Sequence, residues 1–130
     1  MEVTFNKLIP ELSVSDIEKS RAFYLSLGFQ VVYERREDKF CFLELDGNQL
    51  MIEEVNDHWN TATLEYPYGR GVNFSMELSD LDKMYRNVKE NNYPIFRDMK
   101  VDEYRVDDKI YRDREFLIQD LDGYLLRFVD

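Results

Sequence analysis

The stretch Val72-Asn-Phe-Ser-Met-Glu-Leu-Ser-Asp-Leu-Asp-Lys83 decides the fold, because a strand pattern passes directly into a helix start. Apolar and polar residues alternate up to Leu78, which is the two-residue period of a strand with one buried face. Ser79-Asp-Leu-Asp-Lys83 then opens a helical pattern. The same order occurs 64 residues earlier, where Leu8–Val14 precedes Ser15-Asp-Ile-Glu-Lys19. The sequence therefore predicts a duplicated strand–helix unit.

Two helices are predicted, over 16–27 and 80–91. Ser15 is placed as the N-cap of the first, with Glu18 completing a capping box, and Gly28 supplies the stop. The second helix carries one apolar stripe at helical spacing and fades before a proline.

Three strands are predicted after each helix, and in both halves the last two are joined by an Asp-Gly turn. The predicted strands cover 29–35, 39–45 and 49–55 in the first half, then 94–101, 110–119 and 124–129 in the second. The second half carries about twelve extra residues, placed in the charged stretch 98–109, and Arg97–Arg112 is expected to form a twisted, solvated hairpin. The predicted fold class is α+β, a single domain of two βαβββ modules whose curved antiparallel sheets surround a cleft. The modules are predicted at about 1–55 and 71–130, with 56–70 as linker.

Composition sets outer limits on the function. A chain of 130 residues with 44% hydrophobic and 15% aromatic residues can fold as one globule. The net charge of −10 disfavours nucleic acid and anionic lipid as partners, and favours a cationic ligand or simply solubility. The sequence contains one cysteine, Cys41, and no apolar stretch that would span a bilayer or act as a signal, so a reducing, cytoplasmic location is expected.

The motifs together resemble the vicinal-oxygen-chelate superfamily, which contains glyoxalases, bleomycin resistance proteins and extradiol dioxygenases. The resemblance rests on the duplicated helix starts, on Arg114-Glu-Phe116, and on Asp120-Leu-Asp-Gly-Tyr-Leu-Leu-Arg-Phe128. It extends over nearly the whole chain. Leu8-Ile-Pro10 and Phe23-Tyr24 before Leu27-Gly-Phe29 are most similar to bleomycin resistance proteins.

Many enzymes of that superfamily hold a divalent metal with His, Glu or Gln from strands of both halves. Counting from the helix starts and the Asp-Gly turns, the four ligand positions fall on Ile9, Met51, Asn73 and Arg127. An aliphatic group, a thioether, an amide and a cation do not make an oxygen and nitrogen shell for such a metal. No metal, no other cofactor and no catalytic residue is therefore expected.

Bleomycin resistance proteins, in contrast, are metal-free dimers that sequester an antibiotic. The resemblance implies a homodimer here, with Pro10 at the place where the N-terminal strand crosses to the partner in that group. It also implies that Phe40 and Tyr111 stack on a planar ligand, although Tyr111 takes that position only if a bulge absorbs one residue. Without a bulge, Arg112 falls there, and a cation would repel the positively charged tail of a bleomycin.

The predicted inner faces of the two sheets are aromatic and acidic. In the first half, Phe40, Phe42 and Glu44 alternate with apolar residues and are expected to share a face with Met51 and Glu53. Such a face suits a flat or amine-bearing cation. The candidate ligand-binding residues are Glu11, Phe40, Phe42, Glu53, Trp59, Asn73, Glu77, Tyr111 and Arg127.

The linker contributes His58 and Trp59, which are the single histidine and the single tryptophan of the sequence. Trp59 is a candidate for capping a ligand. His58 is not predicted to be a general base, because the sequence places no nucleophile beside it.

Three functions follow as alternatives. The preferred one is a metal-independent dimer that binds a planar or hydrophobic cationic small molecule, such as a glycopeptide antibiotic, without chemistry. The second is a metal-dependent glyoxalase, lyase or dioxygenase of the same superfamily. The third is a structural or regulatory dimer whose cleft is filled by its own side chains.

Overall fold

The computed structural model describes residues 3–130, and the chain divides into two compact units that meet between Tyr68 and Gly69. The first unit contains β1 (Glu11–Val14), α1 (Ile17–Leu27), β2 (Gln30–Arg35), the short 3-10 turn η1 (Arg36–Asp38), β3 (Phe40–Leu45) and β4 (Asn48–Glu54). The second contains β5 (Asn73–Glu77), α2 (Leu81–Glu90), β6 (Ile95–Val106), β7 (Lys109–Gln119) and β8 (Leu125–Val129). The α+β class and the repeated βαβββ order are confirmed.

Each unit forms one four-stranded sheet, in the order β1-β4-β3-β2 in the first and β5-β8-β7-β6 in the second. The sheets are mixed and not purely antiparallel as predicted, because β1 pairs with β4 and β5 pairs with β8 in parallel. The reason is topological. The helix crossover returns the chain so that the last strand of each module runs in the same direction as the first.

The helix starts differ from the prediction by one residue. Asp16, and not Ser15, is the N-cap of α1, and its carboxylate accepts from the Lys19 backbone N–H at 3.1 Å. Asp80 does the same for α2, accepting from Lys83 at 3.0 Å. A carboxylate cap satisfies a free N–H and also favours the positive end of the helix dipole. Gly28 ends α1 with a positive φ of 109°, as predicted.

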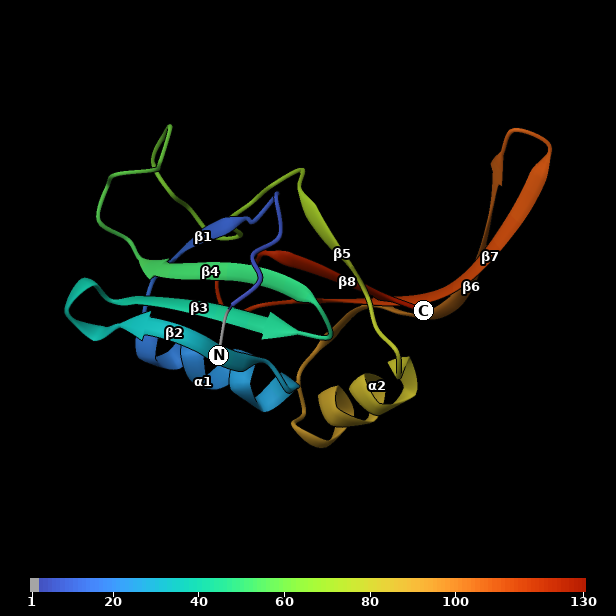
Figure 1. Cartoon of the computed structure of the whole chain (residues 1–130), viewed down its shortest axis with the longest axis horizontal. Helices are drawn as coiled ribbons and strands as arrows, with labels where there is room; N and C mark the ends of the chain where they lie inside the picture. The colour runs from blue at the N-terminus through green and yellow to red at the C-terminus, as the bar shows by residue number, and fades with distance from the viewer. Residues whose placement is uncertain (1–2) are drawn as a thin grey trace. The chain divides into compact units, whose positions relative to one another are not determined.

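The core of the first unit lies between its sheet and α1 (Figure 1). Leu12, Ile52 and Leu43 project from neighbouring strands on this side and are fully buried, together with Phe23 and Tyr24 of the helix. Each buried side chain of this size contributes about 1.5–3 kcal/mol. The strand alternation therefore leaves the odd-numbered residues of β1 and β4 on the face away from α1.

The second unit repeats this plan with α2 against its sheet, and adds a long β6–β7 hairpin that extends beyond β5 and β8 (Figure 1). The hairpin confirms the twisted ribbon predicted for the charged stretch, with its turn at Asp107 and Asp108. Strand β7 pairs with β8 only from Glu115 to Gln119. The outer half of the hairpin is thus a two-stranded, exposed ribbon.

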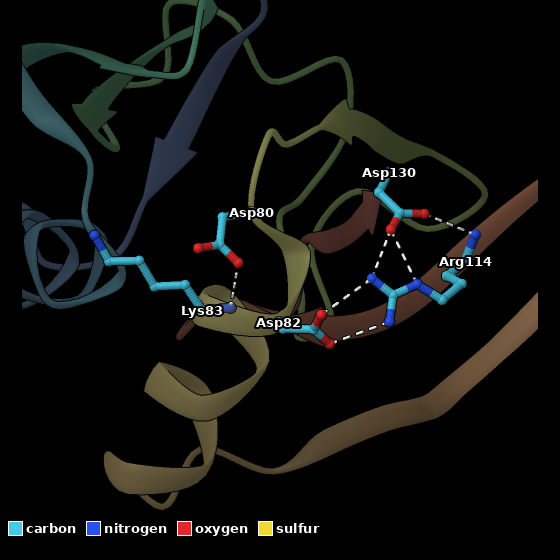
Figure 2. Close-up of polar contacts among 5 residues, drawn as sticks. All are labelled: Asp80, Asp82, Lys83, Arg114 and Asp130. Carbon is cyan, nitrogen blue, oxygen red and sulfur yellow. Dashed lines mark hydrogen bonds and ion pairs between the residues drawn. The ribbon is translucent and has the colours of Figure 1, made fainter.

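Arg114 ties three parts of the second unit together (Figure 2). Its guanidinium donates to both carboxylate oxygens of Asp82 in the first turn of α2, at 3.1 and 3.2 Å. It also donates to Asp130 at 2.7 and 2.9 Å, while the Arg114 backbone N–H donates to the same carboxylate at 3.0 Å. The Arg-Glu-Phe motif therefore has a structural role at this position.

Across residues 3–130, no helix has both the length and the apolar character needed to cross a membrane.

Candidate functional site

The face of the first sheet away from α1 brings aromatic and acidic side chains together. Strand pairing sets two rows across the sheet. One row runs Glu11, Met51, Phe42 and Tyr33, and the other runs Ser13, Glu53, Phe40 and Arg35. We call this the aromatic face, defined by Glu11, Tyr33, Arg35, Phe40, Phe42, Met51 and Glu53. The prediction that Phe40, Phe42, Met51 and Glu53 share a face is confirmed by this register.

Three rings form the centre of the aromatic face. The Tyr33 and Phe42 rings are stacked, with 5.3 Å between centroids and 21° between planes, and Tyr33 lies 5.7 Å from Phe40. Phe40 and Phe42 are only 3% and 1% exposed, whereas Tyr33 is 36% exposed. Tyr33 is therefore the most exposed of the three rings, and the ligand-contact roles of Phe40 and Phe42 stay predictions.

A planar cation already lies on this face. The guanidinium carbon of Arg35 sits 4.3 Å from the centroid of Phe40 and 5.8 Å from that of Tyr33. The Arg35 Nε also donates to Asp38 at 3.0 Å. An arginine over a ring face within about 6 Å is held by cation–π attraction. The sequence reasoning did not include Arg35 or Tyr33 among the site residues.

Two carboxylates border the rings. Burial raises the pKa of Glu11, the nearby charge of Glu53 raises it further, and Arg35 lowers it. Glu53 accepts a hydrogen bond from Asn56 at 2.8 Å. A raised carboxyl pKa means that the fold disfavours the ionised form of Glu11, here mainly because burial removes its hydration. Positive charge beside this carboxylate favours the ionised form, as Arg35 does.

The segment Thr4–Asn6, which we call the N-terminal strap, lies against the same face. The Phe5 ring contacts Phe42 edge-on, with centroids 5.3 Å apart and planes at 79°, and it is 6.4 Å from Tyr33. The strap precedes every predicted strand, so no sequence pattern pointed to it.

The corresponding face of the second sheet carries the remaining candidate ligand-binding residues that lie on strands. Ser75 pairs with Arg127 and Tyr104 with Tyr111, and alternation places Asn73 and Glu77 on the same side. The two tyrosine rings are stacked at 5.6 Å and 18°, and each is 45% exposed. Asn73, Glu77, Tyr111 and Arg127 remain predicted ligand contacts. Tyr104 is the residue here that sequence reasoning missed.

Two carboxyl groups on this second face, those of Glu115 and Asp102, are joined by a hydrogen bond. Glu115 is buried, and burial together with its hydrogen bond to Asp102 raises its pKa. The same hydrogen bond lowers the pKa of Asp102. Within residues 3–130, the buried Nε of Arg127 is the one buried side-chain nitrogen or oxygen without a hydrogen-bond acceptor or donor.

The linker candidates lie at the surface. Trp59 is 66% exposed and meets His58 edge-on at 6.4 Å. A shallow hollow of about 400 Å³ is formed beside the linker by the residues Ser15, Val55, Asp57, Asn60, Thr63, Leu64 and Tyr68. Trp59 is not among its lining residues, so its role as a cap on a ligand stays a prediction.

The side chains at the positions where the superfamily's enzymes hold a metal are not suited to bind a divalent ion. Met51 stands on the aromatic face between Glu11 and Phe42, and Asn73 and Arg127 are on strands of the second sheet. Among the side chains of residues 3–130, no three His, Cys, Asp or Glu converge closely enough to hold a metal ion. Thioether, amide and guanidinium groups do not replace such a cluster for a hard divalent ion.

The chain matches the model of the glyoxalase/bleomycin resistance protein/dioxygenase superfamily over residues 8–128. It belongs to this superfamily. The match begins before β1 and ends one residue before the end of β8, in agreement with the resemblance seen in the motifs.

Solved structures of the superfamily include relatives of this chain. A member from Vibrio splendidus 12B01 is 34% identical over 92% of this chain and 93% of its own, with a TM-score of 0.42. TioX from Micromonospora sp. ML1 is 17% identical, with 96% and 98% covered and a TM-score of 0.71. A bleomycin-binding protein in complex with bleomycin is 21% identical, with 97% and 98% covered and a TM-score of 0.66. No curated protein matches the chain.

Proposed function

We propose that this superfamily member is a binding protein for a small, planar, positively charged aromatic molecule, which it holds on the aromatic face without making or breaking bonds. A bleomycin-binding protein of the same fold shows that this architecture can hold a small molecule. Fold alone does not fix a ligand, so the proposal rests on the chemistry of the face.

The observation that carries the proposal is the position of Arg35. Its guanidinium carbon lies 4.3 Å from the centroid of the Phe40 ring, its Nε donates to the carboxylate of Asp38 at 3.0 Å, and its charge lowers the pKa of Glu11. The aromatic face therefore already satisfies the geometric needs of a planar cation, namely a ring underneath and a carboxylate nearby. A ligand with the same two features would find the same attractions.

Electrostatics act in the same direction at longer range. The chain carries a net charge of −10, which attracts cations and repels anions before contact. Salt screens such attraction over roughly 8–10 Å at physiological ionic strength. Binding is therefore expected to weaken as salt is added.

The biological setting is part of the proposal. We infer a cytoplasmic homodimer that sequesters its ligand, as in antibiotic resistance. In the single chain described, Pro10 O accepts from Met51 N at 2.9 Å within one unit. Sedimentation analysis of the purified chain tests the dimer, and a monomer at micromolar concentration would exclude it.

The binding test is a titration of the purified chain with ethidium, a planar cation, and with metal-free bleomycin, followed by fluorescence anisotropy and calorimetry. We expect saturation at one ligand per chain, loss of affinity with salt and no effect of a chelator. Tyr33→Leu should weaken binding by roughly threefold to tenfold, which corresponds to the loss of one ring contact. Phe96→Leu removes another half-exposed ring, in the second unit, and should leave affinity unchanged.

The competing function is a metal-dependent glyoxalase, lyase or dioxygenase. It predicts stoichiometric metal in the purified protein and an activity that a chelator removes. Metal at one equivalent, together with no binding of either cation, would refute the binding proposal.

A further inference from the structure

The N-terminal strap covers the part of the aromatic face where a ligand ring would stack. Phe5 lies edge-on against Phe42 at 5.3 Å and near Tyr33 at 6.4 Å. Phe42 is 1% exposed beneath these contacts, while Phe5 itself is 52% exposed. A ring that reaches Phe42 from solvent must therefore take the place of Phe5.

A single side chain, Gln49, fastens the strap. Its Oε1 accepts from the Asn6 backbone N–H at 2.8 Å, and its Nε2 donates to the Thr4 carbonyl at 2.7 Å. The same Nε2 donates to Glu44 at 2.7 Å, and Gln49 is 7% exposed. One further bond runs from the Asn6 side chain to the Gly47 carbonyl at 2.9 Å. The latch thus consists of a few polar contacts to β4 and to the turn between β3 and β4.

The strap is weakly built into the fold. Residues 3–9 belong to no strand or helix in the described structure, and Leu8 between the strap and β1 is 87% exposed. A segment with few buried contacts and no backbone ladder opens at low free-energy cost. The first regular pairing is that of Glu11 with Met51. Release of the strap would leave the sheet intact.

We propose that the strap is a displaceable cover, with Phe5 as an internal substitute for the aromatic ring of the ligand and Gln49 as its latch. The aromatic ring of the ligand takes the place of the Phe5 ring on the aromatic face. Only a flat aromatic molecule can then make the ring contacts that Phe5 makes when the strap is closed. This inference rests on the proposed function, because it assigns a gate to the same face.

The direction in which one substitution changes ligand affinity distinguishes a displaceable cover from a permanent wall of the binding site. If Phe5 competes with the ligand, Phe5→Ala raises the fraction of molecules whose face is open, and apparent affinity rises with that fraction. If Phe5 is a wall that contacts bound ligand, the same change lowers affinity. The loss or gain of one edge-on ring contact corresponds to roughly threefold to tenfold.

The experiment measures ethidium affinity by anisotropy for the full chain and three variants. Phe5→Ala and Gln49→Met, which keeps the side-chain length but removes the latch bonds, should each tighten binding roughly threefold to tenfold. Leu8→Ala, at an exposed position between the strap and β1, is the control and should leave affinity unchanged. A reporter chain with Phe5→Trp and Trp59→Phe should show a red shift of its emission as ethidium saturates.

The outcomes separate the two proposals. The cover hypothesis is wrong if Phe5→Ala binds ethidium more weakly than the original chain or equally well. It is also wrong if the Trp emission of the reporter chain is unchanged at saturation. In each of these cases ligand binding itself still stands. Absence of binding by every variant would overturn the proposed function, and the cover with it.

Discussion

The rings of Tyr33 and Phe42 are stacked at 5.3 Å, although they come from two strands whose register shifts just before they meet. Val31 faces Leu43, but Tyr33 faces Phe42, so one extra residue of β2 is absorbed by a β-bulge. A bulge turns the following side chains to the other face of a sheet. This bulge gives the aromatic face its most exposed ring and its arginine.

Glu11→Gln should stabilise the fold and weaken ligand binding at the same time. The pKa of Glu11 is raised by burial and by Glu53, so its ionised form opposes folding. A raised carboxyl pKa contributes stability that is present below the unfolded-state pKa and lost as pH rises through the folded-state value. The stabilising effect of the amide is therefore expected at pH 7 and should vanish below about pH 4.

Urea unfolding at both pH values measures this effect, and ethidium titration measures the loss of affinity. Glu37→Gln removes an exposed carboxylate outside the aromatic face and serves as the control. Equal stability of Glu11→Gln and the original chain at pH 7 would show that Glu11 is well compensated without a ligand.

Cys41 should be unreactive in the folded chain. Its thiol is 1% exposed, and burial raises its pKa to about 11. Because the thiolate is the reactive form, iodoacetamide at about pH 8 should label the chain in urea but not in buffer. Mass spectrometry counts the label. Rapid labelling under native conditions would contradict the burial of this strand.

Gly69→Ala should destabilise the chain more than Gly71→Ala. Both glycines have positive φ values, 71° and 86°, which cost an L-residue about 1–2 kcal/mol. A Cβ on Gly69 would also lie 2.5 Å from the Tyr124 ring, whereas one on Gly71 meets nothing within 4 Å. Overpacking of this kind lowers the free energy of unfolding by about 1–3 kcal/mol more. The difference between the urea midpoints of the two variants measures this extra loss.

Arg114→Lys should lower the thermal midpoint, and more so at low salt than at high salt. Lysine keeps the charge but cannot donate to Asp82 and Asp130 with a planar fork, and those paired contacts depend on the fork. Arg112→Lys is the matched control, because Arg112 makes an exposed ion pair with Glu103. Equal thermal midpoints for the two variants would show that the Arg114 network contributes no more stability than an ordinary surface ion pair.

The features that local sequence determines were predicted well. Capping signals and helical stripes placed both helices to within one residue at all four ends, since those signals act within one turn. The Asp46-Gly47 turn was predicted because this pair of residues favours tight turns, and both residues adopt positive φ in the structure. Strand alternation likewise predicted the shared face of Phe42 and Met51. The parallel pairing of β1 with β4 needed the topology, which no local pattern encodes.

The site was predicted only in part, for physical reasons. Strict alternation would place Tyr33 on the same face as Val31, under α1. The bulge between the two residues reverses this, and it leaves no signal in the composition of the strand. The strap was missed because Phe5 has no periodic neighbours and is held by the side chain of Gln49. Ser15 and Asp16 are both good caps, so the choice between them depends on how the chain leaves β1.

The most direct test of ligand binding on the aromatic face is the methyl spectrum of the chain labelled with carbon-13 at methionine, recorded during titration with ethidium. Met51 lies between Glu11 and Phe42 on that face, while Met76 and Met84 are buried in the second unit. A planar cation stacked on the aromatic face should move the Met51 methyl signal through its ring current and leave Met76 and Met84 in place. Saturable binding that leaves the Met51 signal unchanged would contradict the account.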